Sequence, residues 1–244
     1  MRFRSIFTQN LEAFFLNNKN IDHVIFWIRK VQHHLYSKSS KGHGIHSPSL
    51  FRFVTMTLSN PHSYYAYKAL PTLNKKENFL AKLLYRLVIH QKAKQVVEWN
   101  AMNDTTCNWL ANHESAAEYF CYLQTDQSAN KLLHGETFKQ VHRLPIASIP
   151  ENIPQFNSLD LAVFHPTENP DEQAQISKKF IPLSHENSIF VFCGIHSNRQ
   201  QRLYWRTLQN QPEVTVSIDL FEVGILLFKK DLAPKKLRIR LKHA

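Results

Sequence analysis

One short apolar run in the middle of the chain, residues 95–99 (Q-V-V-E-W), constrains the fold more than any other segment. It is β-branched at its centre and ends on an acidic and an aromatic residue, which is typical of a buried parallel strand. Residues 100–104 must then turn the chain, because residues 105–112 resume a helical spacing, with Asp104 as a candidate N-cap. This strand, loop and helix predict the first unit of an α/β domain.

The same alternation of strand and helix continues toward the C-terminus. We expect strands at residues 117–123, 138–144, 159–164 and 188–193, and helices at residues 126–133, 170–180 and 198–209. Two further strands, residues 214–220 and 223–229, are separated by only two residues, which requires antiparallel pairing. The chain length fits an α/β domain over residues 75–244, preceded by an N-terminal helical arm over residues 1–74.

The residues around Glu98 also carry a family resemblance. A strand that ends in Glu and leads through a loop into a helix resembles the first motif of class I S-adenosylmethionine-dependent methyltransferases, whose usual pattern is E-x-G-x-x-x-G. Glu98 matches the acid, whereas Asn100 and Asp104 stand at the two glycine positions. The run G-I-H-S-P at residues 44–48 is similar to the N-terminal segment of a group of bacterial O-methyltransferase-like proteins. The resemblance implies a Rossmann-like, seven-stranded, mostly parallel sheet whose last strand is antiparallel.

The resemblance further implies where cofactor-binding residues stand. Gln124 falls where the family places an acid for the ribose hydroxyls, and Asp126 either substitutes for that acid or caps the following helix. The related O-methyltransferases read D-x-x-x-x-D after their fourth strand, and here the run begins at Asp160 and ends at His165. The resemblance thus implies six vestigial cofactor-binding residues: Glu98, Asn100, Asp104, Gln124, Asp126 and His165.

Three side chains near the ends of predicted strands, His165, Cys193 and His196, admit a different interpretation. They would form either a soft-ligand metal site or a Cys/His nucleophile pair. A cysteine that ends a buried strand is more often a core residue, and no acid completes the set. We expect no metal ion, since neither His165 nor Cys193 supplies the oxygen ligands that Mg²⁺ requires.

The N-terminal arm contains a helix at residues 21–36, a polar loop and a second helix. The first helix has five apolar side chains on one stripe: Val24, Ile25, Ile28, Val31 and Leu35. This stripe predicts packing on the domain, with a membrane surface as the alternative. Ser47 and Pro48 are the expected N-cap and first residue of the second helix. We expect residues 42–47 to lie over the carboxyl edge of the sheet near residues 100–104, where His43 and His46 are either structural or part of a lid.

Composition narrows the class of protein. The chain has 30 Lys and Arg against 19 Asp and Glu, a formal charge of +11, which either attracts polyanions or makes a generally basic surface. Only five glycines occur, so neither a dinucleotide fingerprint nor a phosphate-binding P-loop can be written. Three cysteines without C-x-x-C spacing indicate buried thiols in a reducing compartment. We find no signal peptide or transmembrane segment and expect a cytoplasmic protein.

These features lead to three hypotheses. The first is a pseudoenzyme, a methyltransferase-fold protein with weak or absent S-adenosylmethionine binding that works as a binding or scaffold module for an unknown small molecule or protein. The second is an active S-adenosylmethionine-dependent methyltransferase acting on a small molecule or another nucleophile. The third is a basic nucleic-acid-binding protein that uses the same fold.

Overall fold

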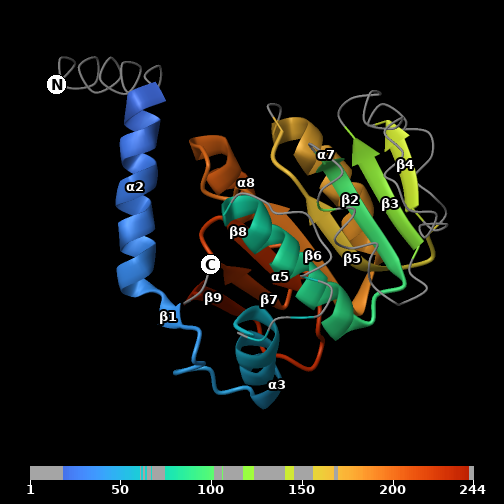
Figure 1. Ribbon diagram of the computed structural model, residues 1–244, viewed down its shortest axis with the longest axis horizontal. Coiled ribbons are helices and arrows are strands. Elements are labelled where there is room, and N and C mark those ends of the chain that lie inside the picture. The colour runs from blue at the N-terminus through green and yellow to red at the C-terminus, as the bar shows by residue number, and fades with distance from the viewer. Residues whose placement is uncertain are drawn as a thin grey trace.

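A mixed sheet in the order β1-β9-β7-β8-β6-β5-β2-β3-β4 organises the molecule (Figure 1). The structure, a computed structural model, describes residues 19–60, 62, 64, 67, 75–101, 106, 118–123, 141–145, 156–167 and 170–241. The strands within these ranges are β1 (Lys38–Ser39), β2 (Gln95–Ala101), β3 (Glu118–Leu123), β4 (Val141–Pro145), β5 (Leu159–Phe164), β6 (Ser184–Cys193), β7 (Val216–Asp219), β8 (Val223–Leu227) and β9 (Lys235–Arg240). Neighbouring strands are parallel except at β8, which runs antiparallel to both β6 and β7.

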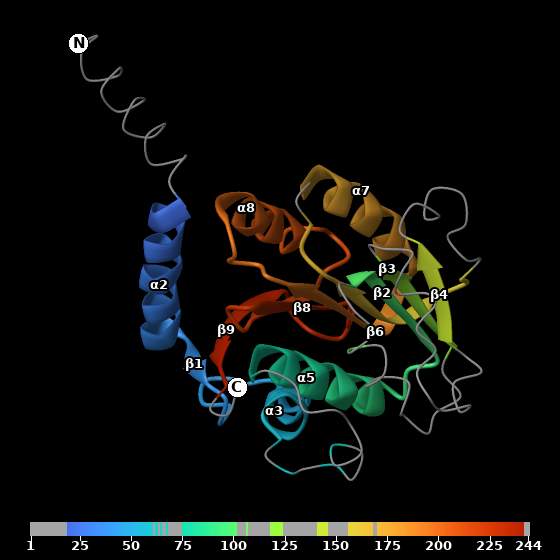
Figure 2. The ribbon, with the colours of Figure 1, turned by 45° about the horizontal axis from the view of Figure 1, so that its top comes forward.

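Helices cover both faces of this sheet (Figure 2). One face carries α5 (Lys75–Gln91), α3 (Pro48–Arg52) and the π-helical turn η1 (Phe53–Leu58), and its core is largely aliphatic. The other face carries α7 (Pro170–Phe180), which continues through the 3₁₀ turn η4 (Ile181–Leu183), and α8 (Arg199–Leu208). The core under α7 and α8 is rich in aromatic side chains, among them Phe164, Phe190, Phe192 and Trp205.

The central strand and the hairpin confirm the predicted fold. β2 lies between β3 and β5, and β7 pairs antiparallel with β8. The expected seven-stranded sheet is extended by β9 and β1, which the sequence analysis did not identify. Leu237 and Ile239 are buried and alternate with charged residues, a period-two pattern that indicates a half-buried strand. The helices expected at residues 105–112 and 126–133 lie outside the described residues, apart from residue 106.

One close contact fixes α8 on the sheet. The indole of Trp205 packs so tightly on β8 that a Cβ at Gly224 would lie 2.6 Å from the nearest ring carbon. Only glycine leaves room for such an approach. The N-terminus of α8 is capped by Asn198, whose side-chain oxygen accepts from the amide of Gln201 at 2.8 Å. The helix is therefore held both by its cap and by its largest side chain.

Helix α2 (Lys19–Tyr36) packs through a different face from the predicted one. The members of the predicted stripe that are more than half exposed are Val24, Ile28, Val31 and Leu35. Phe26, Lys30 and His33 make the contacts instead, with residues 219–222 between β7 and β8. The prediction that the apolar stripe packs on the domain is wrong, because an aromatic contact and polar contacts hold the other face. Within the described residues, no helix is both long enough and apolar enough to cross a membrane.

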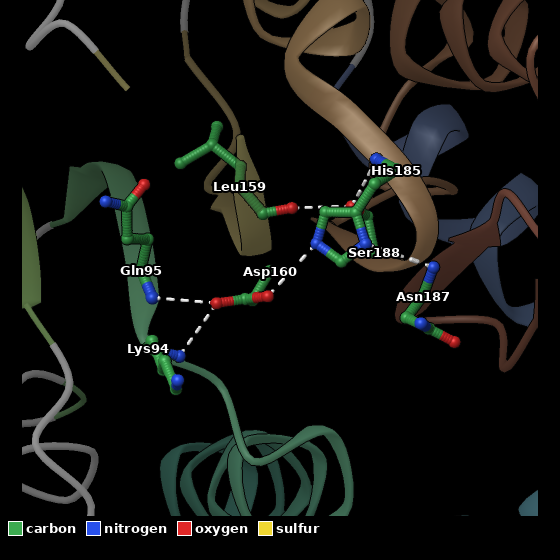
Figure 3. Close-up of polar contacts among 7 residues, drawn as sticks. All are labelled: Lys94, Gln95, Leu159, Asp160, His185, Asn187 and Ser188. Atoms are coloured by element: carbon green, nitrogen blue, oxygen red, sulfur yellow. Dashed lines mark hydrogen bonds and ion pairs between the residues drawn. The ribbon is translucent and has the colours of Figure 1, made fainter. Parts of the chain in front are cut away.

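Asp160 joins three strands at the amino edge of the sheet (Figure 3). One carboxylate oxygen accepts from the amides of Lys94 and Gln95 at 2.7 and 2.9 Å, where β2 begins. The other lies 3.0 Å from Nε2 of His185 in β6. Ser188 extends the cluster, because its hydroxyl donates to the carbonyl of Leu159 at 2.5 Å. The first acid of the D-x-x-x-x-D pattern thus has a structural role far from the carboxyl edge.

We expect Asp160→Ala to lower the free energy of unfolding by about 1–3 kcal/mol, because two amides and an imidazole lose their acceptor. Asp160→Asn keeps one carbonyl acceptor and should cost less. The measurement is urea unfolding, with Asp231→Ala as a control at an exposed aspartate. Equal stability of Asp160→Ala and the control would show that this cluster does not hold the strands.

Candidate functional site

Glu98, in the middle of β2, is the centre of the candidate site. Its side chain is fully buried, and both carboxylate oxygens have partners. The hydroxyl of Tyr119 on β3 donates to Oε2, and Nε2 of His165 lies 2.5 Å from Oε1. His165 follows β5, whose register places Val163 opposite Glu98, and the amide of His165 donates to the carbonyl of Trp99 at 3.0 Å. Three neighbouring strands therefore meet at one carboxylate.

Asn100 occupies the first glycine position of the methyltransferase pattern and keeps a glycine-like backbone. Its φ is 60°, in the left-handed region where Asn is better tolerated than most residues. The side-chain amide is buried and donates to the carbonyl of Pro166 at 2.7 Å. The side chain thus links the ends of β2 and β5. The remaining members of the predicted set, Asp104, Gln124 and Asp126, lie outside the described residues.

Of the three side chains considered as a metal or nucleophile site, the two histidines contact different carboxylates. His165 contacts Glu98, whereas Nε2 of His196 lies 2.8 Å from Asp219. Cys193 is buried, and burial, together with the charge of Glu98, raises the pKa of its thiol. A protonated, buried thiol does not suit nucleophilic chemistry. Among the residues that the structure describes, no group of three or more His, Cys, Asp or Glu side chains is placed to hold a metal ion.

Asp219, at the carboxyl end of β7, anchors the N-terminal arm. Its carboxylate accepts from the amide of Phe221 at 2.8 Å and contacts His196 and, at 3.4 Å, His33 of α2. Burial alone would raise the pKa of this carboxyl, but its hydrogen bonds to His196 and His33 hold the pKa well below its usual range. The ring of Phe221 lies between Phe26 and His196, with ring centroids 5.0 Å from each. The arm therefore rests on the end of β7.

The polar loop that follows β1 exposes His43 and His46 to solvent. Ser47 is the N-cap of α3 as predicted, accepting from the amide of Leu50. Beyond the cap, Phe53 and Met56 line a cavity of about 350 Å³ together with residues 186–189 at the start of β6, which is the amino edge of the sheet. The prediction that the N-terminal arm packs over the carboxyl edge is wrong for α3 and η1, which lie at the amino edge beside His90 and the start of β6. A contact between residues 42–47 and residues 102–105 lies outside the described residues. The lid role of the two histidines and the division at residue 74 stay predictions.

Solved structures show the same fold. A caffeoyl-CoA O-methyltransferase-like protein from Staphylococcus aureus matches with a TM-score of 0.53 and 13% identity, covering 66% of this chain and 87% of that one. TomG, an O-methyltransferase of Streptomyces achromogenes solved with S-adenosylmethionine, matches with a TM-score of 0.51 and 14% identity over 69% and 91%. An O-methyltransferase of Bacillus cereus solved with S-adenosylhomocysteine gives 0.50 and 12% over 77% and 94%.

These matches confirm the resemblance to class I S-adenosylmethionine-dependent methyltransferases at the level of fold. No protein-family model matches the chain, and no curated protein matches it in sequence. At 12 to 14% identity these structural matches show the fold alone. What the site can do therefore depends on its own residues.

Two important residues were not singled out from the sequence. Tyr119 lies in the strand predicted at residues 117–123, where it reads as one more aromatic core residue. Asp219 is an acid near the end of an apolar run, and a charge in that position indicates either a ligand contact or an internal partner. The role of Asp219 could have been suspected from the sequence, whereas the contact of Tyr119 with Glu98 could be recognised only from the register of the strands.

We expect His165→Leu to lower the free energy of unfolding by about 3–5 kcal/mol, because Glu98 loses a partner inside the core. The double variant Glu98→Gln/His165→Leu should be more stable than His165→Leu alone, since a neutral amide costs less to bury without a partner than a carboxylate does. Urea unfolding of the two single variants and the double variant measures this coupling. Additive losses in the double variant would contradict the pairing of these two side chains.

The lowered pKa of Asp219 predicts a pH dependence of stability. Because the folded-state pKa lies below the ordinary value of 3.8, the stabilisation is fully present above that value and is lost as the pH falls below it. We expect the unfolding free energy of the wild type to fall more steeply between about pH 5 and pH 2 than that of Asp219→Asn. Asp231→Asn serves as the control. Parallel pH profiles for the wild type and Asp219→Asn would refute this assignment.

Proposed function

We propose that this protein is a binding or scaffold module built on the methyltransferase fold, in which S-adenosylmethionine binds weakly or not at all. The observation that carries the proposal is the state of Glu98, which is fully buried with both oxygens engaged by Tyr119 and His165. A cofactor that needed this carboxylate would have to displace one of these partners in a low-dielectric core. The residues at the end of β2 therefore fit the cofactor poorly.

The other positions of the pattern support the same conclusion. The side chain of Asn100 fills space between β2 and β5 that a glycine would leave open. Asp104, as a helix cap, would place a negative charge on the amides that otherwise receive a carboxylate. Gln124 lacks the charge of the expected acid, which removes about 1.5–3 kcal/mol from a charge-assisted hydrogen bond. Each change acts in its own way against an adenosine-containing ligand that bears a carboxylate group.

The alternative is an active S-adenosylmethionine-dependent methyltransferase. It is supported by the shared fold of TomG and the Bacillus cereus enzyme, which were solved with S-adenosylmethionine and S-adenosylhomocysteine respectively. Such an enzyme would act by holding a small molecule or another nucleophile in line with the methyl group. The partner of a binding module would be a small molecule or a protein, and the cytoplasmic location belongs to this proposal as well.

The deciding experiment is calorimetric titration of the full chain with S-adenosylmethionine and, separately, S-adenosylhomocysteine. We expect a dissociation constant weaker than about 1 mM, which corresponds to a binding free energy of only about −4 kcal/mol. A cofactor-binding methyltransferase run in parallel checks the titrant. A dissociation constant in the low micromolar range would overturn the binding-module proposal and favour the active enzyme.

A second titration uses the triple variant Asn100→Gly/Asp104→Gly/Gln124→Glu, which restores the family pattern. We expect its affinity for S-adenosylmethionine to improve by about tenfold or more, because bulk is removed and a charged acceptor is added. The matched control makes the same chemical changes at exposed positions, Asn187→Gly/Asp231→Gly/Gln200→Glu. Equal affinity of the two folded triple variants would contradict the assignment of the weak binding to these three positions.

A further inference from the structure

A second candidate site lies near the edge of the sheet that β1 and β9 form. It is a cavity of about 340 Å³ between α2, α8 and the strands β7 and β9. Figure 2 shows α2 and α8 beside the edge of the sheet to which β9 belongs. The cavity is lined by six basic side chains against one acidic one, Asp219; the basic ones are Arg29, Lys38, Arg202, Arg206, Lys236 and Arg238.

The spacing of these residues shows how the fold collects them. Arg202 and Arg206 are one turn apart on α8, and Lys236 and Arg238 are two residues apart on β9, so each pair lies on one face of its element. Like charges at these spacings repel one another. Concentrating them around one cavity is unfavourable in the absence of a negative charge.

The one acidic side chain at this site offsets only one of the six positive charges. Asp219 is already engaged by His196, by His33 and by the amide of Phe221. Lys38 and Lys236 donate to neutral oxygens, the carbonyl of Gly44 at 2.5 Å and the side chain of Asn210 at 2.6 Å. Their positive charges therefore remain available to a ligand.

Three polar atoms that are buried in residues lining this cavity lack hydrogen-bond partners in the part of the chain that the structure describes. They are Nε of Arg29, Nε1 of Trp205 and Nδ1 of His196. Trp205 is 3% exposed, so its N–H has no access to bulk water. Because these three atoms are shut off from the solvent-accessible space, a ligand in the cavity would meet the exposed basic side chains of Arg206, Lys236 and Arg238 instead.

We infer that this cavity binds a small ligand carrying two or more phosphate charges. Arginine side chains from different elements can each hold phosphate oxygens with paired hydrogen bonds. The volume is within the range of small-molecule pockets. A single nucleic-acid strand is disfavoured, because the charges surround one cavity instead of following an extended groove with stacking aromatic rings. The inference is independent of whether S-adenosylmethionine binds elsewhere.

The test is calorimetric titration of the full chain with inorganic pyrophosphate at about 50 mM salt, where screening is moderate. We expect a dissociation constant below about 1 mM for the wild type. The variant Arg206→Gln/Arg238→Gln should bind at least about tenfold more weakly, since two charge-assisted contacts are lost. Both side chains are exposed, and the single variant Arg238→Gln provides the same test with a smaller loss should the double variant not fold.

The matched control is Lys178→Gln/Lys179→Gln, which removes the same charge from exposed positions on α7 that do not line the cavity. We expect it to keep the wild-type affinity within about twofold. Equal weakening in the control and in Arg206→Gln/Arg238→Gln, or no binding of pyrophosphate by the wild type, would overturn the inference. A single-stranded oligonucleotide that binds at least about tenfold more tightly than pyrophosphate, and loses affinity in Arg206→Gln/Arg238→Gln, would assign the site to nucleic acid instead.

Discussion

The burial of a carboxylate in the central strand is the constraint on which the surrounding arrangement depends. β2 is flanked by β3 and β5 and covered on both faces, so water cannot solvate Glu98. Tyr119 and His165 supply the missing partners, and through them β3 and β5 are tied to the same group. Low dielectric strengthens each contact but makes the loss of any one costly. The three side chains therefore act as a unit.

The same network explains why the carboxyl edge of this sheet differs from the usual methyltransferase pattern. An Asp at the position of His165 would bring a second negative charge toward Glu98, and the two carboxylates would repel. The imidazole instead contacts Glu98, so the side chain that follows β5 is directed into the protein. Cys193 lies within the field of the same carboxylate, which adds to the effect of burial in raising its thiol pKa. The polar side chains at this edge thus make their contacts inside the protein.

The sequence predicted the elements whose signal is local. β2 has a β-branched centre at Val96 and Val97, and the short connection between β7 and β8, residues 220–222, leaves only antiparallel pairing. The packing face of α2 could not be predicted in this way, because Lys30 finds Glu222 at a separation of 192 residues and Phe26 finds Phe221. Hydropathy favoured the opposite stripe, which is exposed. Polar contacts of this kind appear only when the fold has brought distant segments together.

The candidate sites show the same limit. Motif spacing identified Glu98 and His165, but not their contact, and composition gave a net positive charge without its distribution. The charges converge only because β1 pairs with β9 and because Trp205 seats α8 on Gly224. A fold that gathers six basic side chains around a single acidic one is stabilised by any anion that binds there, since ligand binding adds to the free energy of folding. An anion between Arg29 and Arg238 would also join α2 to β9, and so strengthen the docking of an arm whose apolar face is left in solvent.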